Sequence, residues 1–315
     1  MMVARFAFLL IVLGLFSHSA SYGAEKKKLW VYTSVYKEYS TPLGKAFEAK
    51  HPEYQAEIFQ GGSEKLQAKV EAEILGGKPQ ADVVMTSDPF WTRDFEKRGQ
   101  TAGNPQLNYY SLMVMVCHQG LPADKRPQTF QDLAKPEFKN LIQIGSPLES
   151  GTQFMAVAYL SDKYGWDFYE KLRANNLASS GGNSTVIQKV ESGEKKVGIV
   201  LLENAIAARK RGSPIEIIYP TDGSIPLPNM QVMVKGSPNP EGAKMFMDFV
   251  LSKEGQQILL GGYMYTLHKQ LPNPEGAKPL KEVTKNSTPW TTARIEKFAG
   301  AGKEIKKKFS QLILE

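Results

Sequence analysis

LWVYTS at residues 29–34, YQAEIF at 54–59 and ADVVM at 81–85 are short apolar or β-branched runs that suit buried strands. Between them, residues 41–50 and 63–75 place apolar side chains at helical spacing. The order is therefore β-α-β-α-β in under 60 residues. Such alternation predicts parallel strands with helices on both faces of the sheet and right-handed crossovers between the strands.

The same α/β order restarts after a strand-like run at 109–117 and a break at Gly120-Leu121-Pro122. A second turn-rich crossing is expected at 222–228, followed by a strand at 230–234 and a mostly helical remainder with a last helix from Thr292. The two crossings predict two α/β lobes, with 24–112 and 230–315 in the first and 113–229 in the second. Within the second lobe we expect strands at 141–144, 197–202 and 216–219 and helices at 129–133, 153–164, 184–191 and 206–210.

The first residues have the layout of a cleaved secretory signal. An apolar run at 6–16 follows Arg5 and precedes the small residues 17–24. The run is shorter than the roughly 20 residues that a membrane-spanning helix needs. We therefore expect residues 1–23 to be removed and the protein to be exported to the periplasm.

Composition and charge describe an ordinary globular chain, with 42% hydrophobic and 23% charged residues. The single cysteine, Cys117, lies at the end of an apolar run, so we expect a buried small hydrophobic residue and no disulfide. Much of the net charge of +7 comes from lysines in the last part of the chain, interleaved with Ile305, Phe309 and Leu312 at helical spacing. This pattern is typical of the solvated face of a helix, and no nucleic-acid partner is expected.

Five junctions between a strand and a helix carry small polar residues. Each offers backbone N–H groups, a hydroxyl and the positive end of a helix dipole, which together favour an anion, although simple helix capping would also explain each one. In open α/β sheets ligands bind at the carboxyl ends of the strands, so these junctions are candidates for one ligand site. The candidate residues are Thr33, Ser34, Gly62, Ser63, Ser87, Ser150, Gly151, Thr152, Asn183 and Ser184.

Three further candidates lie close to strand ends. Glu203 and Asn204 directly follow the strand expected at 197–202, and Tyr36 follows the first strand. As a site residue, Glu203 would accept from ligand hydroxyls or pair with an amine or a metal, while Asn204 would donate to a phosphate or accept from a sugar hydroxyl. The alternatives are a surface acid for Glu203 and a core position for Tyr36.

Enzymatic motifs are mostly absent from the sequence, which contains no P-loop, HExxH, paired CxxC or GxSxG motif. Ser34-Val35-Tyr36-Lys37 matches the S-x-x-K of penicillin-recognising serine enzymes, but the companion S-D-N and K-T-G motifs are missing. The four histidines are scattered, so no histidine metal cluster is suggested. We expect a binding protein without a cofactor or metal, and a secreted serine enzyme is the alternative.

Taken in order and spacing, these motifs resemble the type II periplasmic solute-binding proteins of ABC importers, the group that binds ferric iron, phosphonates, thiamine and sugar phosphates. The resemblance implies two α/β lobes, each a mostly parallel sheet flanked by helices, joined by two crossing strands and closing over a ligand by hinge motion. It covers nearly the whole mature chain and rests on LWVYTS at 29–34, AFE at 46–48 with Pro52, Gly62-Ser63, ADVV at 81–84, Ser150-Gly151-Thr152, residues 182–193, VGI at 197–199, NPEGAK at 239–244 and SKEGQ at 252–256.

The resemblance also bears on the ligand and the partner. Iron-binding relatives place a tyrosine pair where this chain has Glu203-Asn204, so a small organic anion such as a sugar phosphate or phosphonate is favoured over ferric iron. An unusual iron site of Tyr36, Glu203 and Tyr263 is the alternative. We expect a monomer that delivers its solute to an ABC permease in the inner membrane or, alternatively, presents its closed form to a membrane sensor kinase.

Overall fold

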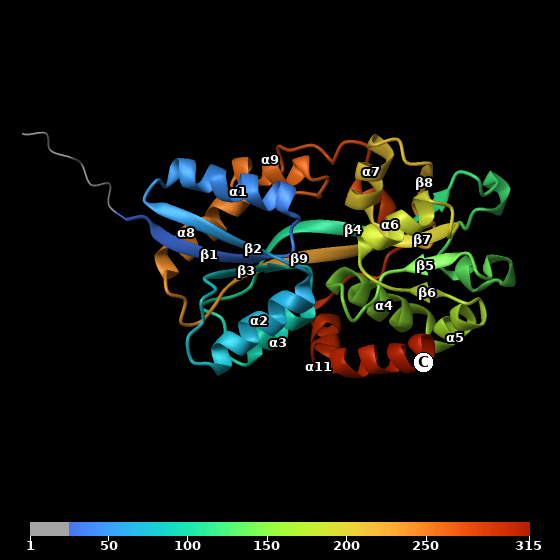
Figure 1. The fold of residues 1–315 in the computed structure, drawn as a ribbon, viewed down its shortest axis with the longest axis horizontal. Coiled ribbons are helices and arrows are strands. Elements are labelled where there is room, and N and C mark those ends of the chain that lie inside the picture. The colour runs from blue at the N-terminus through green and yellow to red at the C-terminus, as the bar shows by residue number, and fades with distance from the viewer. Residues whose placement is uncertain (1–24) are drawn as a thin grey trace, which may run out of the picture.

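The computed structural model describes residues 25–315, so the expected signal sequence at 1–23 lies outside the described residues. Its strands form one continuous sheet in the order β2-β1-β3-β9-β4-β7-β5-β6, with β8 beside β4. Figure 1 shows this sheet passing through two halves, each flanked by helices. No helix within residues 25–315 combines the length and the apolar character needed to cross a bilayer.

The first half of the molecule has the predicted alternation of strands and helices. Strand β1 lies between β2 and β3 and is parallel to both. The helices that connect these strands therefore begin at the carboxyl ends of the strands, on the same edge of the sheet. The elements are β1 (Lys27–Thr33), α1 (Lys37–Lys50), β2 (Tyr54–Gln60), α2 (Ser63–Leu75), β3 (Val83–Thr86) and α3 (Pro89–Lys97).

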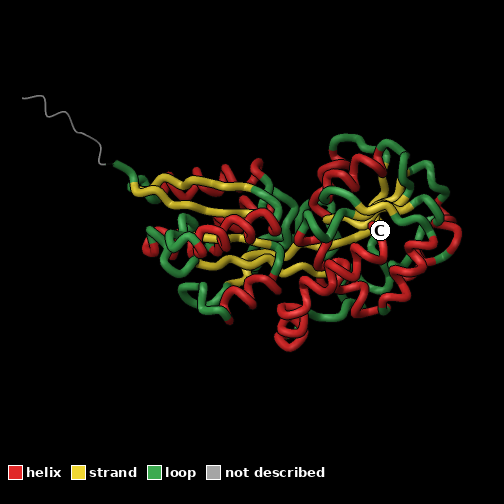
Figure 2. The backbone as a smooth tube through the Cα atoms, turned by 60° about the horizontal axis from the view of Figure 1, so that its bottom comes forward, coloured by secondary structure: helices red, strands yellow, loops and turns green. Residues whose placement is uncertain are grey.

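Two long strands, β4 (Gln106–His118) and β9 (Ile225–Met233), join the halves. The first part of β4 pairs antiparallel with β9, and its last part pairs antiparallel with β7 (Val197–Leu201) and β8 (Ile215–Ile218). In turn, β9 pairs with β3 through Met230–Met233. Figure 2 shows strands crossing the waist between the halves, as the two expected crossing strands require.

The second crossing differs from its expected form. Residues 222–228 were expected to be turn-rich, whereas β9 already begins at Ile225 and includes Pro226 and Pro228. Proline is tolerated in a strand where its missing N–H faces no partner strand. The carbonyl oxygen of Pro226 accepts a hydrogen bond from Trp290 Nε1 at 2.7 Å, so this edge of β9 faces a side chain.

The second half repeats the α/β order. Strand β5 is parallel to β6 and to β7, and helices follow each of these strands. The predicted short helix near 129–133 is a 3-10 turn. The elements are η1 (Ala123–Lys125), η2 (Gln131–Ala134), η3 (Pro136–Phe138), β5 (Ile142–Ile144), α4 (Gly151–Tyr164), α5 (Trp166–Ala174), β6 (Ala178–Ser179), α6 (Asn183–Glu191), β7, α7 (Leu202–Lys210) and β8.

The return segment after β9 serves both halves. Helices α8 (Pro240–Leu251) and α9 (Lys253–Gly261) pack on the first half, and α10 (Leu280–Val283) follows. Helix α11 (Thr292–Phe309) and the π-helical turn η4 (Ser310–Leu314) pack on the core of the second half through Phe298 and Phe309, and Phe298 also packs against Phe90 of α3 in the first half, with ring centroids 5.2 Å apart. The placement of all of 230–315 in the first lobe stays a prediction, because α11 has apolar partners on α3 of the first half as well as in the second half.

Each half has its own hydrophobic core. In the first half, the ring of Phe47 packs against Phe246 and Phe249 of α8, at centroid distances of 5.2 and 5.9 Å. The second core surrounds α4, in which every residue from Gly151 to Leu160 is buried. Cys117 is fully buried in this second core, as predicted, and burial raises the pKa of its thiol to about 12.

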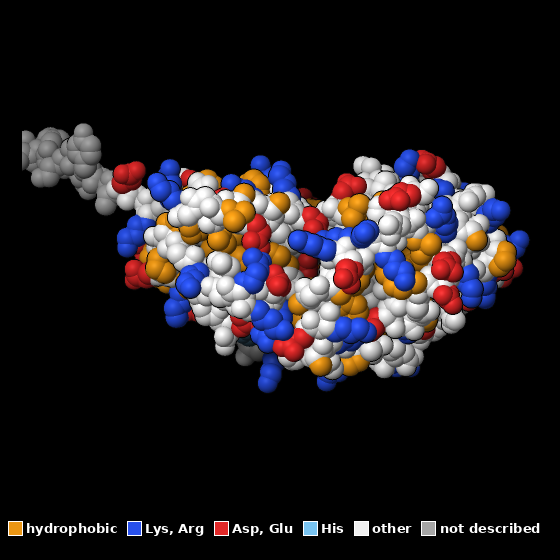
Figure 3. Space-filling view, turned by 90° about the horizontal axis from the view of Figure 1, so that it is seen from below, with side chains coloured by type: hydrophobic (Ala, Val, Ile, Leu, Met, Phe, Trp, Pro, Cys, Tyr) orange, Lys and Arg blue, Asp and Glu red, His pale blue; other side chains and the backbone are white. Residues whose placement is uncertain are grey.

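Ion pairs connect α11 to the first half. Glu296 Oε1 lies 2.6 Å from Arg93 Nη2 on α3, and Lys306 Nζ lies 2.7 Å from Glu64 Oε2 on α2. Figure 3 views the molecule from this side and shows Lys and Arg side chains interspersed with Asp and Glu. The lysines of α11 thus lie on a face of mixed charge.

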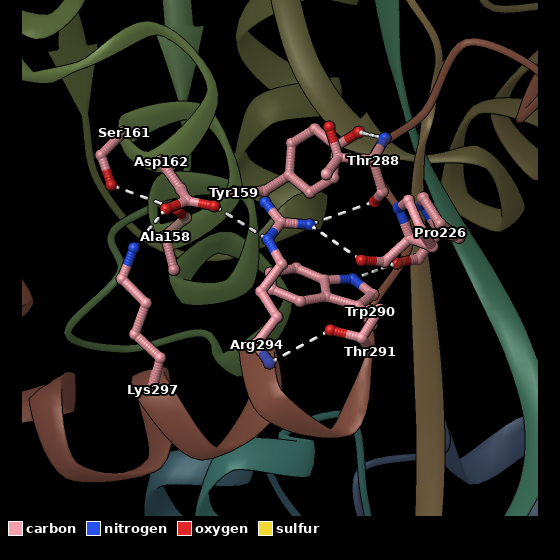
Figure 4. Close-up of polar contacts among 11 residues, drawn as sticks. Ala158, Tyr159, Ser161, Asp162, Pro226, Thr288, Trp290, Thr291, Arg294 and Lys297 are labelled. Atoms are coloured by element: carbon pink, nitrogen blue, oxygen red, sulfur yellow. Dashed lines mark hydrogen bonds and ion pairs between the residues drawn. The ribbon is translucent and has the colours of Figure 1, made fainter.

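Arg294 fixes α11 to α4 (Figure 4). Its Nε lies 2.8 Å from Asp162 Oδ2, and its Nη1 donates to the carbonyl oxygen of Thr288 at 3.1 Å. The guanidinium lies 4.2 Å from the Trp290 ring centroid and 4.8 Å from that of Tyr159. Only 9% of the Arg294 side chain is exposed. A cation so enclosed is stabilised by its carboxylate partner and the two aromatic faces together.

We predict that Arg294→Ala lowers the free energy of unfolding by about 2–4 kcal/mol, because Asp162 loses its less exposed partner and the rings lose their cation. The matched control is Lys297→Ala. Lys297 also pairs with Asp162, at 2.7 Å, but 66% of its side chain is exposed, so its loss should cost about 0.5 kcal/mol. Urea unfolding followed by circular dichroism measures both changes, and equal losses would contradict the role assigned to Arg294.

Candidate functional site

Strand-to-helix junctions from both halves meet around one cavity of about 260 Å³. They follow β1, β2 and β3 in the first half and β5 and β6 in the second. Because the strands that these junctions follow are parallel within each half, the junctions lie at the carboxyl ends of the strands, on the side that faces the other half. The sequence-predicted residues that line this cavity are Ser34, Tyr36, Gly62, Ser63, Ser87, Ser150, Gly151, Thr152, Asn183 and Ser184.

Three helices begin at this cavity: α2 at Ser63, α4 at Gly151 and α6 at Asn183. The first N–H groups of a helix have no partner within the helix, and the helix dipole adds partial positive charge there. Gly62 and Gly182 cap α2 and α6 without a side-chain hydrogen bond. Among the described residues, no lysine, arginine or histidine lines the cavity. The donors that this cavity offers are therefore backbone N–H groups and hydroxyls, and the exposed Glu149 carboxylate also lines it.

Glycines allow the two halves to approach each other across the cavity. A Cβ atom placed on Gly151 of α4 would lie 2.7 Å from Ser63 Cβ on α2, closer than side chains pack. A Cβ atom on Gly62 would lie 3.0 Å from the carbonyl oxygen of Glu149. The Ser63 and Ser87 hydroxyl oxygens, 3.0 Å apart, form the adjoining wall in the first half. Any side chain at position 151 would thus force the halves apart.

Asn183 organises the wall contributed by the second half. Its Oδ1 accepts hydrogen bonds from Gln153 Nε2 at 2.9 Å and from the Leu201 N–H at 3.1 Å. Its Nδ2 donates to Thr152 Oγ1 at 2.9 Å, and Thr152 Oγ1 lies 3.0 Å from Ser150 Oγ. Because its amide oxygen and one amide N–H are bonded inside the protein, Asn183 positions the hydroxyls at the start of α4.

A second cavity, of about 250 Å³, adjoins the first; Tyr36 and Ser184 line both. We call it the outer cavity. The Tyr36 hydroxyl lies 3.2 Å from Asn204 Nδ2 and 3.3 Å from Asn204 Oδ1, so this pair links the first half to the second. Burial raises the pKa of Tyr36, which keeps its phenol neutral. The ionisable residues lining the outer cavity are Tyr36, Glu38, Tyr39, Glu191, Glu203 and Arg211.

Glu203 lies in the first turn of α7, because the preceding strand ends at Leu201 and the helix, expected at 206–210, already begins at Leu202. Only 7% of the residue is exposed, so the alternative of a surface acid is wrong. Within the described residues its Oε2 is buried and has no hydrogen-bond partner, while the Ser111 hydroxyl bonds to the carboxylate. Desolvation by burial raises the pKa of Glu203 to about 7, and the bond from Ser111 offsets only part of that effect.

Two polar residues beside Glu203 were not predicted from the sequence. Ser111 of β4 and Asn229 of β9 line a small cavity of about 40 Å³, together with Tyr109 and Glu203. We call it the inner cavity. Asn229 Nδ2 donates to Ser111 Oγ at 3.2 Å. Their only sequence signal is a polar side chain within a mostly apolar crossing strand, and that signal does not show which face of the strand they occupy.

Some predicted residues lie outside the site. Thr33 is buried and lines none of the three cavities; its Oγ1 accepts a hydrogen bond from the Val35 N–H at 3.1 Å. Lys37 is exposed at the start of α1 and lines none of them either, so it is no partner for Ser34. Tyr263 also lies outside these cavities, with Lys210 Nζ 5.0 Å from its ring centroid.

Sequence comparisons identify related proteins. A family model described as "Bacterial extracellular solute-binding protein" matches residues 30–261. An uncharacterised protein of Haemophilus influenzae is 26% identical over 264 residues, which is 74% of this chain and 75% of that protein. A Salmonella paratyphi A protein, provisionally named a 2-aminoethylphosphonate-binding periplasmic protein, is 28% identical over 200 residues. That alignment covers 56% of this chain and 59% of the Salmonella protein, less than two thirds of its length.

Solved structures share the fold at lower sequence identity. The periplasmic binding protein AfuA from Actinobacillus pleuropneumoniae, with fructose-6-phosphate bound, matches with a TM-score of 0.80 and 24% identity, over 92% of this chain and 99% of that one. Iron-bound HitA from Pseudomonas aeruginosa matches with a TM-score of 0.76 and 21% identity, over 90% and 99% of the two chains. The expected two-lobe α/β periplasmic binding protein fold is confirmed.

We predict that Glu203→Gln stabilises the ligand-free protein by an amount that increases with pH. An unfolded glutamate titrates near pH 4.5 and the folded one near pH 7, so between these values the native state holds the extra proton and wild-type stability falls as pH rises. The glutamine does not titrate. Its advantage should therefore grow from about pH 4.5 and level off above pH 7, at no more than about 3 kcal/mol.

Thermal unfolding of both proteins between pH 4 and 9 measures this difference. Glu304→Gln, which neutralises an exposed carboxylate on α11, is the control and should show no such increase. A constant difference between Glu203→Gln and wild type across this range would show that folding does not raise the pKa of Glu203.

Proposed function

The chain belongs to the family of bacterial extracellular solute-binding proteins, and we propose that it captures a small organic anion with a phosphate or phosphonate group between its two halves. Members of this family bind solutes and are not enzymes. The alternative of a serine enzyme also lacks its base, because Lys37 is exposed and apart from the cavity that Ser34 lines.

The observation that carries this proposal is the set of helix N-termini around the 260 Å³ cavity. Ser63, Gly151 and Asn183 begin helices on opposite sides of it, and hydroxyls of Ser34, Ser87 and Thr152 line the space between them. A phosphate or phosphonate has several acceptor oxygens and negative charge, so it can use many converging N–H and O–H donors at once. A neutral sugar would leave the partial positive charge of these helices uncompensated.

Capture would occur by closure of the halves about β4 and β9. The Tyr36–Asn204 hydrogen bond and the contact of Gly151 with Ser63 join the halves on either side of the cavity. A ligand shifts this equilibrium only by its differential affinity, about 1.4 kcal/mol for each tenfold preference for the closed form. The closed protein would then present a composite surface of both halves to an ABC permease in the inner membrane.

Iron is the second candidate ligand, because HitA, which shares the fold, is iron-bound. Two features of this chain argue against it. Among residues 25–315 no group of three or more His, Cys, Asp or Glu side chains could hold a metal ion, so an iron site would need tyrosine ligands. The proposed third ligand, Tyr263, lines none of the three cavities that Tyr36 and Glu203 line, so the three side chains do not converge on one site.

The test is to identify the solute that the exported protein carries. Denaturing the purified protein and analysing the released material by mass spectrometry and metal analysis should reveal an organic phosphate or phosphonate and less than stoichiometric iron. Thermal-shift titration should then show a midpoint that rises with the concentration of such anions and not with ferric citrate. Stoichiometric iron in the released material would overturn the proposal.

We further predict that Gly151→Ala weakens binding of the most stabilising anion at least tenfold. The added methyl group would meet Ser63 Cβ at 2.7 Å and would disfavour the closed form. Gly300→Ala on α11 is the matched control, because a Cβ atom there has no neighbour within 4 Å, and its affinity should be unchanged. Titration calorimetry measures both variants. Unaltered affinity in Gly151→Ala would show that binding does not require the two halves to meet at this glycine.

A further inference from the structure

Glu203 is the one ionisable side chain shared by the inner and outer cavities apart from the phenol of Tyr36. It is 7% exposed, and within the described residues its Oε2 has no partner. An ionised carboxylate without a compensating charge is costly to bury, and the bonds from the Ser111 hydroxyl and from its own backbone N–H do not replace the lost hydration. The carboxylate therefore needs a partner that the described residues do not supply.

The groups around Glu203 show what kind of partner fits. Phenols approach it from several elements: Tyr36 before α1, Tyr39 on α1, Tyr109 on β4 and Tyr265 after α9. Burial raises the pKa of each, so these phenols stay neutral at physiological pH. The charged residues that line the two cavities with it are Glu38, Glu191 and Arg211, of which Arg211 caps the far end of α7 and is exposed.

The two ends of the cleft thus differ in polarity. The 260 Å³ cavity presents helix N-termini and hydroxyls with one exposed carboxylate, Glu149, at its lining, whereas the region around Glu203 presents three carboxylates and aromatic rings. Tyr36 lines all three cavities and connects these two regions. Carboxylates and aromatic faces together are the surroundings that a protonated amine prefers, since it ion-pairs with the first and has a cation–π attraction to the second.

We propose that the ligand carries an ammonium group that ion-pairs with Glu203, which makes it a zwitterionic aminoalkyl phosphonate or phosphate and makes Glu203 the residue that selects it. This inference rests on the proposed anion site at the helix N-termini. The ammonium supplies the positive charge that the buried carboxylate lacks, and its remaining N–H groups have Ser111 Oγ and the phenol oxygens as nearby acceptors. A sugar phosphate would offer only neutral hydroxyls to this carboxylate.

Proton linkage gives the proposal a second readout. An ammonium pairs with the ionised form of Glu203. In the free protein Glu203 is mostly protonated below about pH 7, so the ligand has to displace that proton. Affinity for an amine-bearing ligand should therefore fall about tenfold per pH unit below pH 7, relative to a ligand of the same anionic group without the amine. Glu203→Gln should remove this relative pH dependence.

The experiment is calorimetric titration of the whole mature protein with 2-aminoethylphosphonate, ethylphosphonate and fructose 6-phosphate. Wild type should bind 2-aminoethylphosphonate at least 30-fold more tightly than ethylphosphonate at pH 8. Glu203→Gln should reduce this ratio to about threefold or less while its affinity for ethylphosphonate stays within about threefold of wild type. Glu304→Gln, far from the cavities on α11, should keep the wild-type ratio.

The outcomes separate the two proposals. Equal binding of the two phosphonates, or tighter binding of fructose 6-phosphate than of 2-aminoethylphosphonate, would overturn the role of Glu203 and leave the anion site standing. Binding of none of the three compounds would overturn both. A loss of affinity in Glu203→Gln that is equal for both phosphonates would show that Glu203 acts on the anion site or on folding and does not bind an amine.

Discussion

The antiparallel pairing of β4 with β9 is the constraint on which the rest of the molecule depends. These two strands belong to both halves of the sheet. Besides pairing with each other, β9 pairs with β3 of the first half and β4 pairs with β7 and β8 of the second. Every other strand in the described part of the chain pairs within one half only. The ladder sets the distance and orientation at which the carboxyl ends of two parallel sheets oppose each other. The cavity between the halves follows from that arrangement.

The polarity of the cleft also follows from topology. Helices that connect parallel strands begin at the carboxyl ends, so α2, α4 and α6 bring partial positive charge to the same space without any basic side chain. Glu203 is placed differently: it belongs to the first turn of α7 and is enclosed by the crossing strands themselves. Backbone thus supplies one end of the site and a buried side chain the other, which is a geometry suited to a solute with charges of opposite sign.

Helix α11 adds a second connection between the halves. Arg294 anchors it to α4 through Asp162 and the rings of Tyr159 and Trp290, whereas Glu296 and Lys306 reach acids and bases of α3 and α2. The anchor is enclosed and the other pairs are partly exposed, so their strengths should differ. The proposed movement of the halves would therefore have to change these ion pairs and the packing of Phe90 on Trp290 and Phe298, while the pair of Arg294 with Asp162 lies on the second-half side.

Local pattern was enough to predict most of the elements and the junctions that line the cavity. Strand ends and helix starts are local features, so a few neighbouring residues are enough to predict them. Examples are the apolar runs 29–33 and 197–201 and the glycines at 62 and 151 with the hydroxyls beside them. Three things depended on contacts between distant segments. These are the strand conformation of Ile225–Pro228 beside β4, the packing of α11 on the second half, and the enclosure of Glu203 by Ser111 and Asn229. Sequence by itself determined the alternating α/β order and the polar character of each strand end. Only the tertiary structure decided which strand ends meet and which carboxylate is buried, because burial depends on neighbours that lie far apart in the chain.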